Sequence, residues 1–248
     1  MQSISYSQIT AGMQCPRKLR LMKDNAQPDY MSGDLAFGTT MHSAIHGCIL
    51  GKNAEEIFST NWDFCSEGYT FGRYKWEELK DIGLTLLSKF DRLHKKNYDP
   101  SAFMEERIFD KIEGLEGTPD YVGMYKGKLS LRDFKTSGTP YKKEKLIVGS
   151  QLHLYAYLYY TKTGKWVETL GYDVFCKSTS SIQNLTVDLD KDKVIGSVSH
   201  LNVLKVALFS LTELAPKVYS SCIIGSQKCQ YFNTCHEGGK NGTADGNE

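Results

Sequence analysis

The chain has 248 residues, of which 40% are hydrophobic, 24% charged and 12% aromatic, a composition typical of a globular protein. These values exclude collagen-like, mucin-like and intrinsically disordered chains. Thirty Lys and Arg residues stand against 29 Asp and Glu residues, so the formal net charge is +1. Any contact with nucleic acid must therefore rely on local basic patches, because a chain-wide positive field is absent.

The sequence shows no export signal and no membrane span by inspection. We find no apolar run that approaches the roughly 18 residues needed to cross a bilayer. The first six residues, MQSISY, lack both the basic and the apolar segment of a signal peptide. We therefore expect a soluble, cytoplasmic protein with no membrane contact.

Hydrophobic spacing predicts helices in the first hundred residues. Ser5–Gln8 has the pattern of a capping box and predicts the start of a helix. Pro16 suits the first turn of a second, short helix. Longer helices are expected over residues 39–50 and around 74–96, where apolar residues recur at helical spacing.

The apolar period changes to two in the middle of the chain and then returns to helical spacing. Strands are expected over residues 103–112, 117–125, 128–135, 170–176 and 182–189, and helices over 150–160 and 193–214. This order predicts an α/β fold in which a central mixed sheet is flanked by helices. Residues 238–248 form a Gly/Asn/Asp tail that we expect to be disordered.

Two aspartates are predicted to face each other across a hairpin. Lys126-Gly127 is a plausible turn, and Asp120 and Asp133 lie at equal distances from it. Residues opposed in this way have Cβ atoms roughly 4.5–5.5 Å apart, close enough for two carboxylates to share a cation. Lys135 lies two residues beyond Asp133 and therefore on the same face of the strand.

The alternative is a surface hairpin whose Asp and Lys side chains form a solvated pair of little energetic value. That interpretation would be preferred for an isolated Asp-x-Lys tripeptide. Here Gly117-Thr118-Pro119-Asp120 precedes the tripeptide at hairpin spacing, which favours a functional site.

These motifs, taken in order, resemble the PD-(D/E)XK nucleases, and within them the RecB-like exonuclease branch that includes AddB and the CRISPR-associated RecB-like exonucleases. The resemblance rests on the G-x-x-D segment ending at Asp120, the D-x-K segment Asp133-Phe134-Lys135, and Gln151 with Tyr155 in a Q-x-x-x-Y segment. Two upstream segments agree, namely Gly38–His42 and the segment that carries Glu106, in which Glu105 is an equal candidate. A set of motifs in family order is more specific than any one of them.

The resemblance implies a restriction-endonuclease-like core in a single nuclease domain over residues 1–237. It implies phosphodiester hydrolysis with Mg²⁺ or Mn²⁺. The implied metal ligands are His42, Asp120, Asp133 and the backbone carbonyl of Phe134, and the other implied catalytic residues are Lys135, Gln151, Tyr155 and Glu106. Lys135 would orient or deprotonate a water, or stabilise charge in the transition state. Gln151 and Tyr155 share a helix face, whose alternative role is plain packing.

Four of the seven cysteines gather near the chain ends, and disulfides are not expected in a reducing compartment. Cys15, Cys222, Cys229 and Cys235 resemble the four thiols that hold a [4Fe–4S] cluster in members of this branch, which would join residues 1–25 to residues 214–237. Ser226 occupies the position where the family has a cysteine, and Cys222 lies further upstream. Structural Zn²⁺ and free thiols are the alternatives. Cys48, Cys65 and Cys176 are expected to be inert packing residues.

The sequence hypothesis is a metal-dependent DNA exonuclease with a cysteine-ligated structural cluster. The resemblance implies a role in recombination, repair or DNA degradation, in a phage or a prokaryote, alone or with a separate recombination or helicase partner. Its rivals are an endonuclease, a catalytically inactive nucleic-acid-binding protein on the same fold, and a cysteine-rich zinc or redox protein. The preference for single-stranded or end-containing duplex DNA, the choice of DNA over RNA, the cleavage polarity and the oligomeric state do not follow from the sequence.

Overall fold

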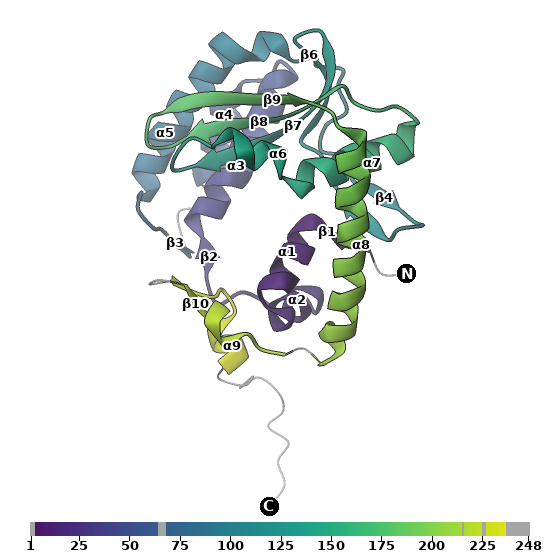
Figure 1. The fold of residues 1–248 in the computed structure, drawn as a ribbon. Coiled ribbons are helices and arrows are strands. Elements are labelled where there is room, and N and C mark those ends of the chain that lie inside the picture. The colour runs from purple at the N-terminus through teal and green to yellow at the C-terminus, as the bar shows by residue number, and fades with distance from the viewer. Residues whose placement is uncertain (1–2, 64–67, 215, 225–226, 237–248) are drawn as a thin grey trace, which may run out of the picture. The chain divides into compact units, whose positions relative to one another are not determined.

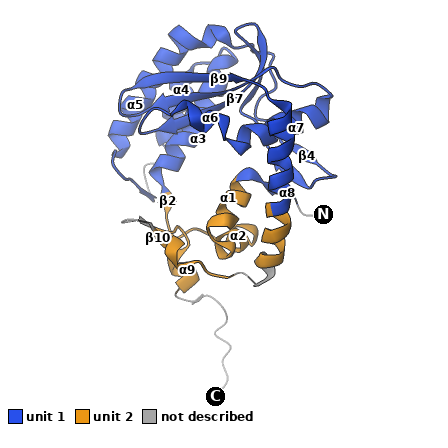
Figure 2. Cartoon of the chain, in the orientation of Figure 1, with its two compact units in different colours: residues 1–6, 32–203 blue, residues 7–31, 204–248 orange. Residues whose placement is uncertain are grey.

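The computed structural model describes residues 3–63, 68–214, 216–224 and 227–236. The chain divides into two compact units (Figure 2). The first unit contains residues 1–6 and 32–203, and the second contains residues 7–31 and 204–248. A single nuclease domain over residues 1–237 stays a prediction. Cys65, Ser226 and the predicted tail at 238–248 lie outside the described residues.

The first unit is built on a four-stranded mixed sheet (Figure 1). Its strands, in spatial order, are β6 (Tyr121–Tyr125), β7 (Lys128–Ser137), β8 (Thr169–Cys176) and β9 (Ser181–Asp188). The outer pairs are antiparallel, whereas β7 and β8 are parallel and are joined through helices, as a parallel connection requires. The predicted mixed sheet flanked by helices is therefore confirmed.

Each face of this sheet has its own hydrophobic core. Phe134 and Phe175 face a core formed with α3 (Gly33–Ile49), α4 (Ala54–Asp63) and α5 (Trp76–Lys89). Leu131 and Val174 face the other core, which includes buried residues of α6 (Lys143–Ile147), α7 (Ser150–Thr163) and the start of α8 (Lys191–Leu214). Adjacent residues of a strand point to opposite faces, so Asp133 and Lys135 lie on the α7 side and Phe134 lies on the α3 side.

The first unit also contains a smaller, three-stranded sheet, which holds parts of two strands that were predicted to be longer. It consists of β1 (Ile4–Ser5), β5 (Leu115–Gly117) and β4 (Ile108–Asp110). The prediction of one strand over 103–112 was wrong because Glu105 has a positive φ of 54°, which interrupts extended backbone. The prediction of one strand over 117–125 was also wrong: β5 and β6 belong to different sheets, and residues 118–120 connect them.

Three short features accompany the helices of the first unit. They are β2 (Met31–Ser32) paired with β3 (Tyr69–Thr70), a π-helical turn over Phe90–His94 that continues α5, and a 3₁₀ turn over Lys95–Asn97. The helix predicted over 39–50 begins earlier, at Gly33, because the Ser32 side chain caps it by accepting a hydrogen bond from the Leu35 N–H.

The second unit combines segments from both ends of the chain. It contains α1 (Tyr6–Gln14) from its second residue onward, α2 (Pro16–Lys23), the end of α8, a 3₁₀ turn (Tyr219–Ser221), β10 (Ile223–Ile224), β11 (Gln227–Lys228) and α9 (Phe232–His236). Asp29 joins the N-terminal segment of this unit to α9. Its carboxylate accepts hydrogen bonds from the backbone N–H groups of Asn233 and Thr234 at the start of that helix.

Helix α8 corrects the expectation that no apolar run is long enough for a membrane. Residues Lys191–Leu211 are long and apolar enough to cross one, by length and composition alone. Only 22% of this stretch is buried in the protein, including Val194, Val198 and Leu201, so burial in a core does not account for its apolar character. The absence of membrane contact stays a prediction.

A buried ion pair ties the central strands together. Arg132 of β7 and Asp173 of β8 are fully buried, and the Arg132 Nε lies 2.5 Å from Oδ2 of Asp173. The same carboxylate accepts a hydrogen bond of 2.6 Å from the Tyr98 hydroxyl. The Arg132 guanidinium also lies over the Tyr125 ring, 3.9 Å from its centroid. Arg132 therefore fixes the strand whose next residue is Asp133.

Replacing Arg132 by Met should destabilise the protein strongly, because it leaves the Asp173 carboxylate buried without its ionic partner. We expect the free energy of unfolding, measured by urea denaturation, to fall by about 3–5 kcal/mol. Lys128→Met is the matched control, since Lys128 of the same strand forms an exposed pair with Asp188 and should cost less than about 1 kcal/mol. Equal effects of the two variants would contradict this role.

Candidate active site

The hairpin register predicted from the sequence is confirmed. Tyr121 pairs with Arg132 and Val122 with Leu131, so the same register sets Asp120, just before β6, opposite Asp133 of β7. Lys126 and Gly127 form the turn with positive φ values of 50° and 82°, as a tight primed turn requires.

Asp120 is held in place by a backbone group of the opposite strand. Its Oδ2 accepts a hydrogen bond of 2.7 Å from the Phe134 N–H, and its Oδ1 faces His42. The residue is 8% exposed, so its carboxylate is held in a largely buried position from which Oδ1 can serve a ligand shared with His42.

Two further ligand groups meet Asp120. One ligand atom each from His42, Glu105 and Asp120 lie within 4.8 Å of one another, and the His42 Nδ1 is 3.5 Å from Asp120 Oδ1. Burial alone lowers the pKa of His42, but the hydrogen bond to Asp120 and the charges of Asp120 and Asp133 outweigh it and raise that pKa. Burial and the Asp120 charge raise the pKa of Glu105. Imidazole and carboxylate donors in this arrangement fit a divalent cation such as Mg²⁺ or Mn²⁺.

Glu105, and not Glu106, occupies the position beside His42 and Asp120. The positive φ of Glu105 is a strained conformation for a non-glycine residue, held by a 3.1 Å hydrogen bond from its N–H to the Pro119 carbonyl. Glu106 instead forms an exposed ion pair with Lys162. Both glutamates were candidates from the sequence, but the sequence gave no signal for the positive φ that places Glu105, and not Glu106, at the site.

Asp133 is buried beside this group and forms an ion pair with Lys135. Its side chain is 2% exposed, and Lys135 Nζ lies 2.7 Å from its Oδ2. Burial, followed by the negative charge of Asp120, raises the pKa of Asp133, while Lys135 opposes that rise. Asp133 is not one of the three groups within 4.8 Å, although its charge acts on His42.

Lys135 links Asp133 of β7 to the side chains of α7. Its Nζ donates a hydrogen bond of 3.1 Å to Gln151 Oε1, and Gln151 Nε2 donates one of 3.0 Å to the Tyr155 hydroxyl. Burial lowers the pKa of Lys135, but the charge of Asp133 and its hydrogen bond outweigh burial and raise it. Lys135 is therefore a positively charged group at neutral pH, and the structure brings it together with Gln151 and Tyr155 as the sequence predicted.

A comparison with known proteins identifies the arrangement. A model of the PD-(D/E)XK nuclease superfamily matches residues 3–236. The chain belongs to this superfamily. No curated protein matches the chain. Its sheet and helices are the restriction-endonuclease-like fold of the superfamily.

Two solved structures are similar to this nuclease-superfamily chain at low sequence identity. The first, named "Putative exonuclease" and from Eubacterium rectale, has a TM-score of 0.58 at 11% identity, covering 87% of this chain and 83% of its own. The second, SSO0001, has 15% identity and covers 85% of this chain and 84% of its own, with a TM-score of 0.36 that is too low to support an argument. The first likeness bears on the fold alone.

Close packing explains why a glycine stands at Gly117, the first position of the G-x-x-D segment. A Cβ at this position would lie 2.5 Å from Cε1 of Tyr155 and 3.1 Å from Cδ1 of Leu158. The Tyr155 ring therefore packs directly on the backbone that leads to Asp120. The G-x-x-D and Q-x-x-x-Y motifs, which are separate in the sequence, are therefore in direct contact in the fold.

Tyr172 is a neighbour of the site that the sequence did not indicate. It pairs with Asp133 across the parallel β7–β8 ladder, and its ring centroid is 6.0 Å from Lys135 Nζ. Burial and the Asp133 charge raise the pKa of Tyr172. Finding Tyr172 would require the register of a parallel strand pair, which depends on the intervening helices.

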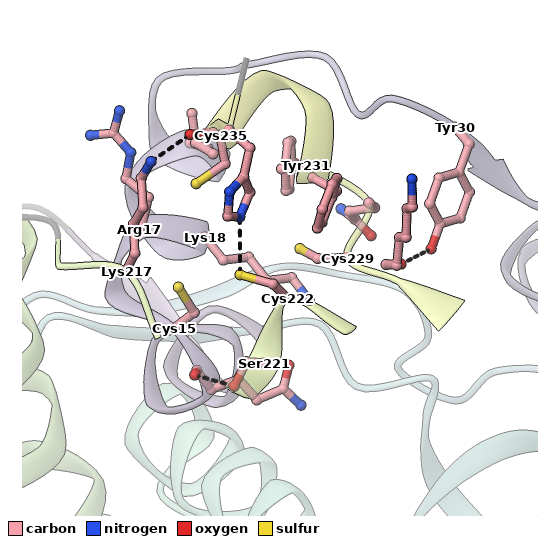
Figure 3. Close-up of a pocket in the computed structure, with 16 residues that line it drawn as sticks. Cys15, Arg17, Lys18, Tyr30, Lys217, Ser221, Cys222, Cys229, Tyr231 and Cys235 are labelled. Atoms are coloured by element: carbon pink, nitrogen blue, oxygen red, sulfur yellow. Dashed lines mark hydrogen bonds between the residues drawn. The ribbon is translucent and has the colours of Figure 1, made fainter. Parts of the chain in front are cut away.

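The four predicted cluster cysteines line one cavity of about 210 Å³ in the second unit, which we call the cysteine cavity. Figure 3 shows the sulfurs of Cys15, Cys222, Cys229 and Cys235 around this space. Burial, and then the nearby Cys235, Cys15 and Cys229, raise the pKa of Cys222. None of these four cysteines forms a disulfide.

Two of the remaining cysteines are buried away from the cysteine cavity. The Cys48 thiol donates a hydrogen bond to Asp91, and burial raises its pKa to about 12. Cys176 is fully buried in β8. Both environments disfavour the reactive thiolate, in agreement with the packing role expected for them.

Replacing Asp133 by Asn should stabilise the metal-free protein at alkaline pH. The pKa of Asp133 is raised in the folded state, so its contribution to stability is present at low pH and is lost as pH rises through the folded pKa. The amide of an asparagine side chain mimics the protonated carboxyl group. We expect a gain of roughly 1–3 kcal/mol in the free energy of unfolding at about pH 8, shrinking as pH is lowered to about 5.

Urea denaturation in a chelator measures this gain, and Asp188→Asn, at an exposed position of β9, serves as the control with no pH-dependent gain. A loss of stability in Asp133→Asn at pH 8 would show that the Lys135 pair outweighs the cost of burying the carboxylate.

Replacing Gly117 by Ala should displace Tyr155 and with it Gln151. The added Cβ would overlap the Tyr155 ring, so we expect a loss of about 1–3 kcal/mol in the free energy of unfolding. Cleavage of DNA by the folded variant should fall about tenfold or more, because the reacting groups are misplaced. Gly138→Ala is the control, since its Cβ would meet open space. Unchanged cleavage by Gly117→Ala would refute this role.

Proposed function

We propose that this member of the PD-(D/E)XK superfamily is a divalent-metal-dependent DNA exonuclease. The observation that carries the proposal is the convergence of His42, Glu105 and Asp120 beside Asp133 and Lys135. Nucleases of this superfamily typically use Mg²⁺ or Mn²⁺, and the donor atoms here suit either ion.

His42, Glu105 and Asp120 would hold the cation, with Asp133 and the Phe134 carbonyl as the further ligands implied by the family motifs. A cation held there would supply positive charge for the scissile phosphate and would lower the pKa of a bound water. The partial burial of Asp120 and His42 strengthens that charge interaction, because fewer waters screen it.

Lys135 is proposed to stabilise negative charge on the phosphate as the bond to the leaving oxygen breaks. Its raised pKa keeps the ammonium protonated, which favours this role over general-base catalysis. Asp133 and Gln151 hold the ammonium from two sides. Tyr155 fixes the Gln151 amide, so the two α7 residues position Lys135 before the substrate arrives.

The exonuclease assignment rests on the motif resemblance and on the printed name of the Eubacterium rectale protein. The rival hypothesis of an inactive nucleic-acid-binding protein is disfavoured by the acidic, lysine and glutamine positions, which are all filled and brought together. We also propose that the protein acts in the cytoplasm, alone or with a separate recombination or helicase partner.

We further propose that the cysteine cavity holds a [4Fe–4S] cluster. The spacing of Cys222 and Cys229 is explained by a hairpin: β10 and β11 pair Ile223 with Lys228, and the same register brings Cys222 opposite Cys229. The Cys229 N–H donates a hydrogen bond of 2.8 Å to the Cys222 carbonyl, which extends that pairing. Cys222 can thus serve as a ligand despite its upstream position.

The spacing of the sulfurs favours the cluster over zinc. Four cysteines around Zn²⁺ have sulfurs about 3.8 Å apart, because each Zn–S bond is about 2.3 Å. Within the described ranges the only three ligand atoms mutually within 4.8 Å are those of His42, Glu105 and Asp120, so no three of the four sulfurs are that close. A four-iron cluster holds its cysteines further apart.

The proposed activity is tested with end-labelled linear DNA and covalently closed circular DNA, each incubated with Mg²⁺ or Mn²⁺. We expect the linear DNA to be degraded, the circles to survive, and a chelator to stop the reaction. Lys135→Met should reduce the rate by about 100-fold or more, because it removes a charge used in the transition state. Lys128→Met, on the same strand but exposed, should retain activity.

Cutting of the circles would establish the endonuclease alternative. Binding of DNA without cleavage by the native protein would establish the inactive binding protein.

The proposed cluster is tested by metal analysis of the full chain purified without oxygen. We expect about four iron and four sulfide per chain and a broad visible absorbance. Cys222→Ser should lose most of this iron, while Cys48→Ser, outside the cysteine cavity, should keep it. One zinc per chain would identify a zinc site, and a metal-free native protein would identify free thiols.

A further inference from the structure

His236 contacts one of the four cysteines in the cysteine cavity. Its Nε2 lies 3.3 Å from the Sγ of Cys222, the contact marked by the dashed line that ends at Cys222 in Figure 3. The histidine lines the cavity together with the four thiols. Neither the sequence motifs nor the spacing of the cysteines assigns it a role.

The orientation of this imidazole is fixed by protein contacts. The ring stacks on Phe232, one helical turn earlier in α9, with centroids 4.6 Å apart and planes inclined by 22°. Tyr219 approaches at 6.1 Å and 63°. Asp29 holds the N-terminus of α9 through backbone hydrogen bonds. The contact with Cys222 is therefore built into the fold rather than left to a freely rotating side chain.

Four thiolates complete the ligand set of a [4Fe–4S] cluster, which leaves the imidazole free to act as a hydrogen-bond donor. An N–H group beside a ligating sulfur stabilises the negative charge on it, and it stabilises the reduced state most. Hydrogen bonds to the sulfurs are one of the factors that set the reduction potential of such clusters.

We propose that His236 is a positioning residue that donates Nε2–H to the Cys222 sulfur and raises the reduction potential of the cluster. This inference rests on the proposed cluster.

The test compares the native full chain with His236→Ala, His236→Gln and His200→Ala, all purified without oxygen. Gln retains an N–H donor, and His200 is an exposed histidine of α8 that does not line the cavity. Two properties are measured: the Fe–S(Cys) stretching bands by resonance Raman spectroscopy, and the potential by a dithionite titration followed by electron paramagnetic resonance.

We expect His236→Ala to move the Fe–S(Cys) bands to higher frequency and the potential to a more negative value, with partial return in His236→Gln and no change in His200→Ala. Iron content separates the two claims. A native protein without iron overturns the cluster and this inference together. Four iron per chain with identical bands in the native protein and His236→Ala overturns the inference alone, and so does an isotope-sensitive nitrogen coupling that identifies His236 as an iron ligand.

Discussion

The crowding of negative charge at one end of the β6–β7 hairpin is the constraint on which the rest of the site depends. Asp120 and Asp133 are buried, and Glu105 lies beside Asp120 at an exposed position, so negative charge gathers where burial strengthens its repulsion. Burial first, and then the negative charge of Asp120, raise the pKa values of Asp133 and Glu105. A bound divalent cation would offset this repulsion, which is the physical basis of the proposed metal site.

Elements on both faces of the sheet hold these charged side chains close together. The buried Arg132–Asp173 pair fixes β7 on the face opposite Asp133, and α3 brings His42 to the hairpin. On the other face, α7 supplies Gln151 to hold Lys135. Because strand neighbours point to opposite faces, one short segment of β7 serves a structural ion pair and a chemical site at once.

The sequence was sufficient where local geometry alone decides the outcome. The turn at Lys126-Gly127 determines the register that opposes Asp120 and Asp133, and period-two geometry then places Lys135. It was insufficient where backbone reversals or distant strands decide it. The left-handed conformation of Glu105 and the pairing of Tyr172 with Asp133 depend on contacts made by separate elements. The hairpin that brings Cys222 beside Cys229 was likewise invisible, because two-residue strands leave no periodic signal.

The most direct test of the account is a crystal structure of the native protein grown with Mn²⁺ and measured at a wavelength where manganese scatters anomalously. The account predicts an anomalous peak within bonding distance of His42, Glu105 and Asp120, with Lys135 adjacent to it. An ordered site without any peak at saturating Mn²⁺, or manganese bound elsewhere with these side chains pointing apart, would contradict it.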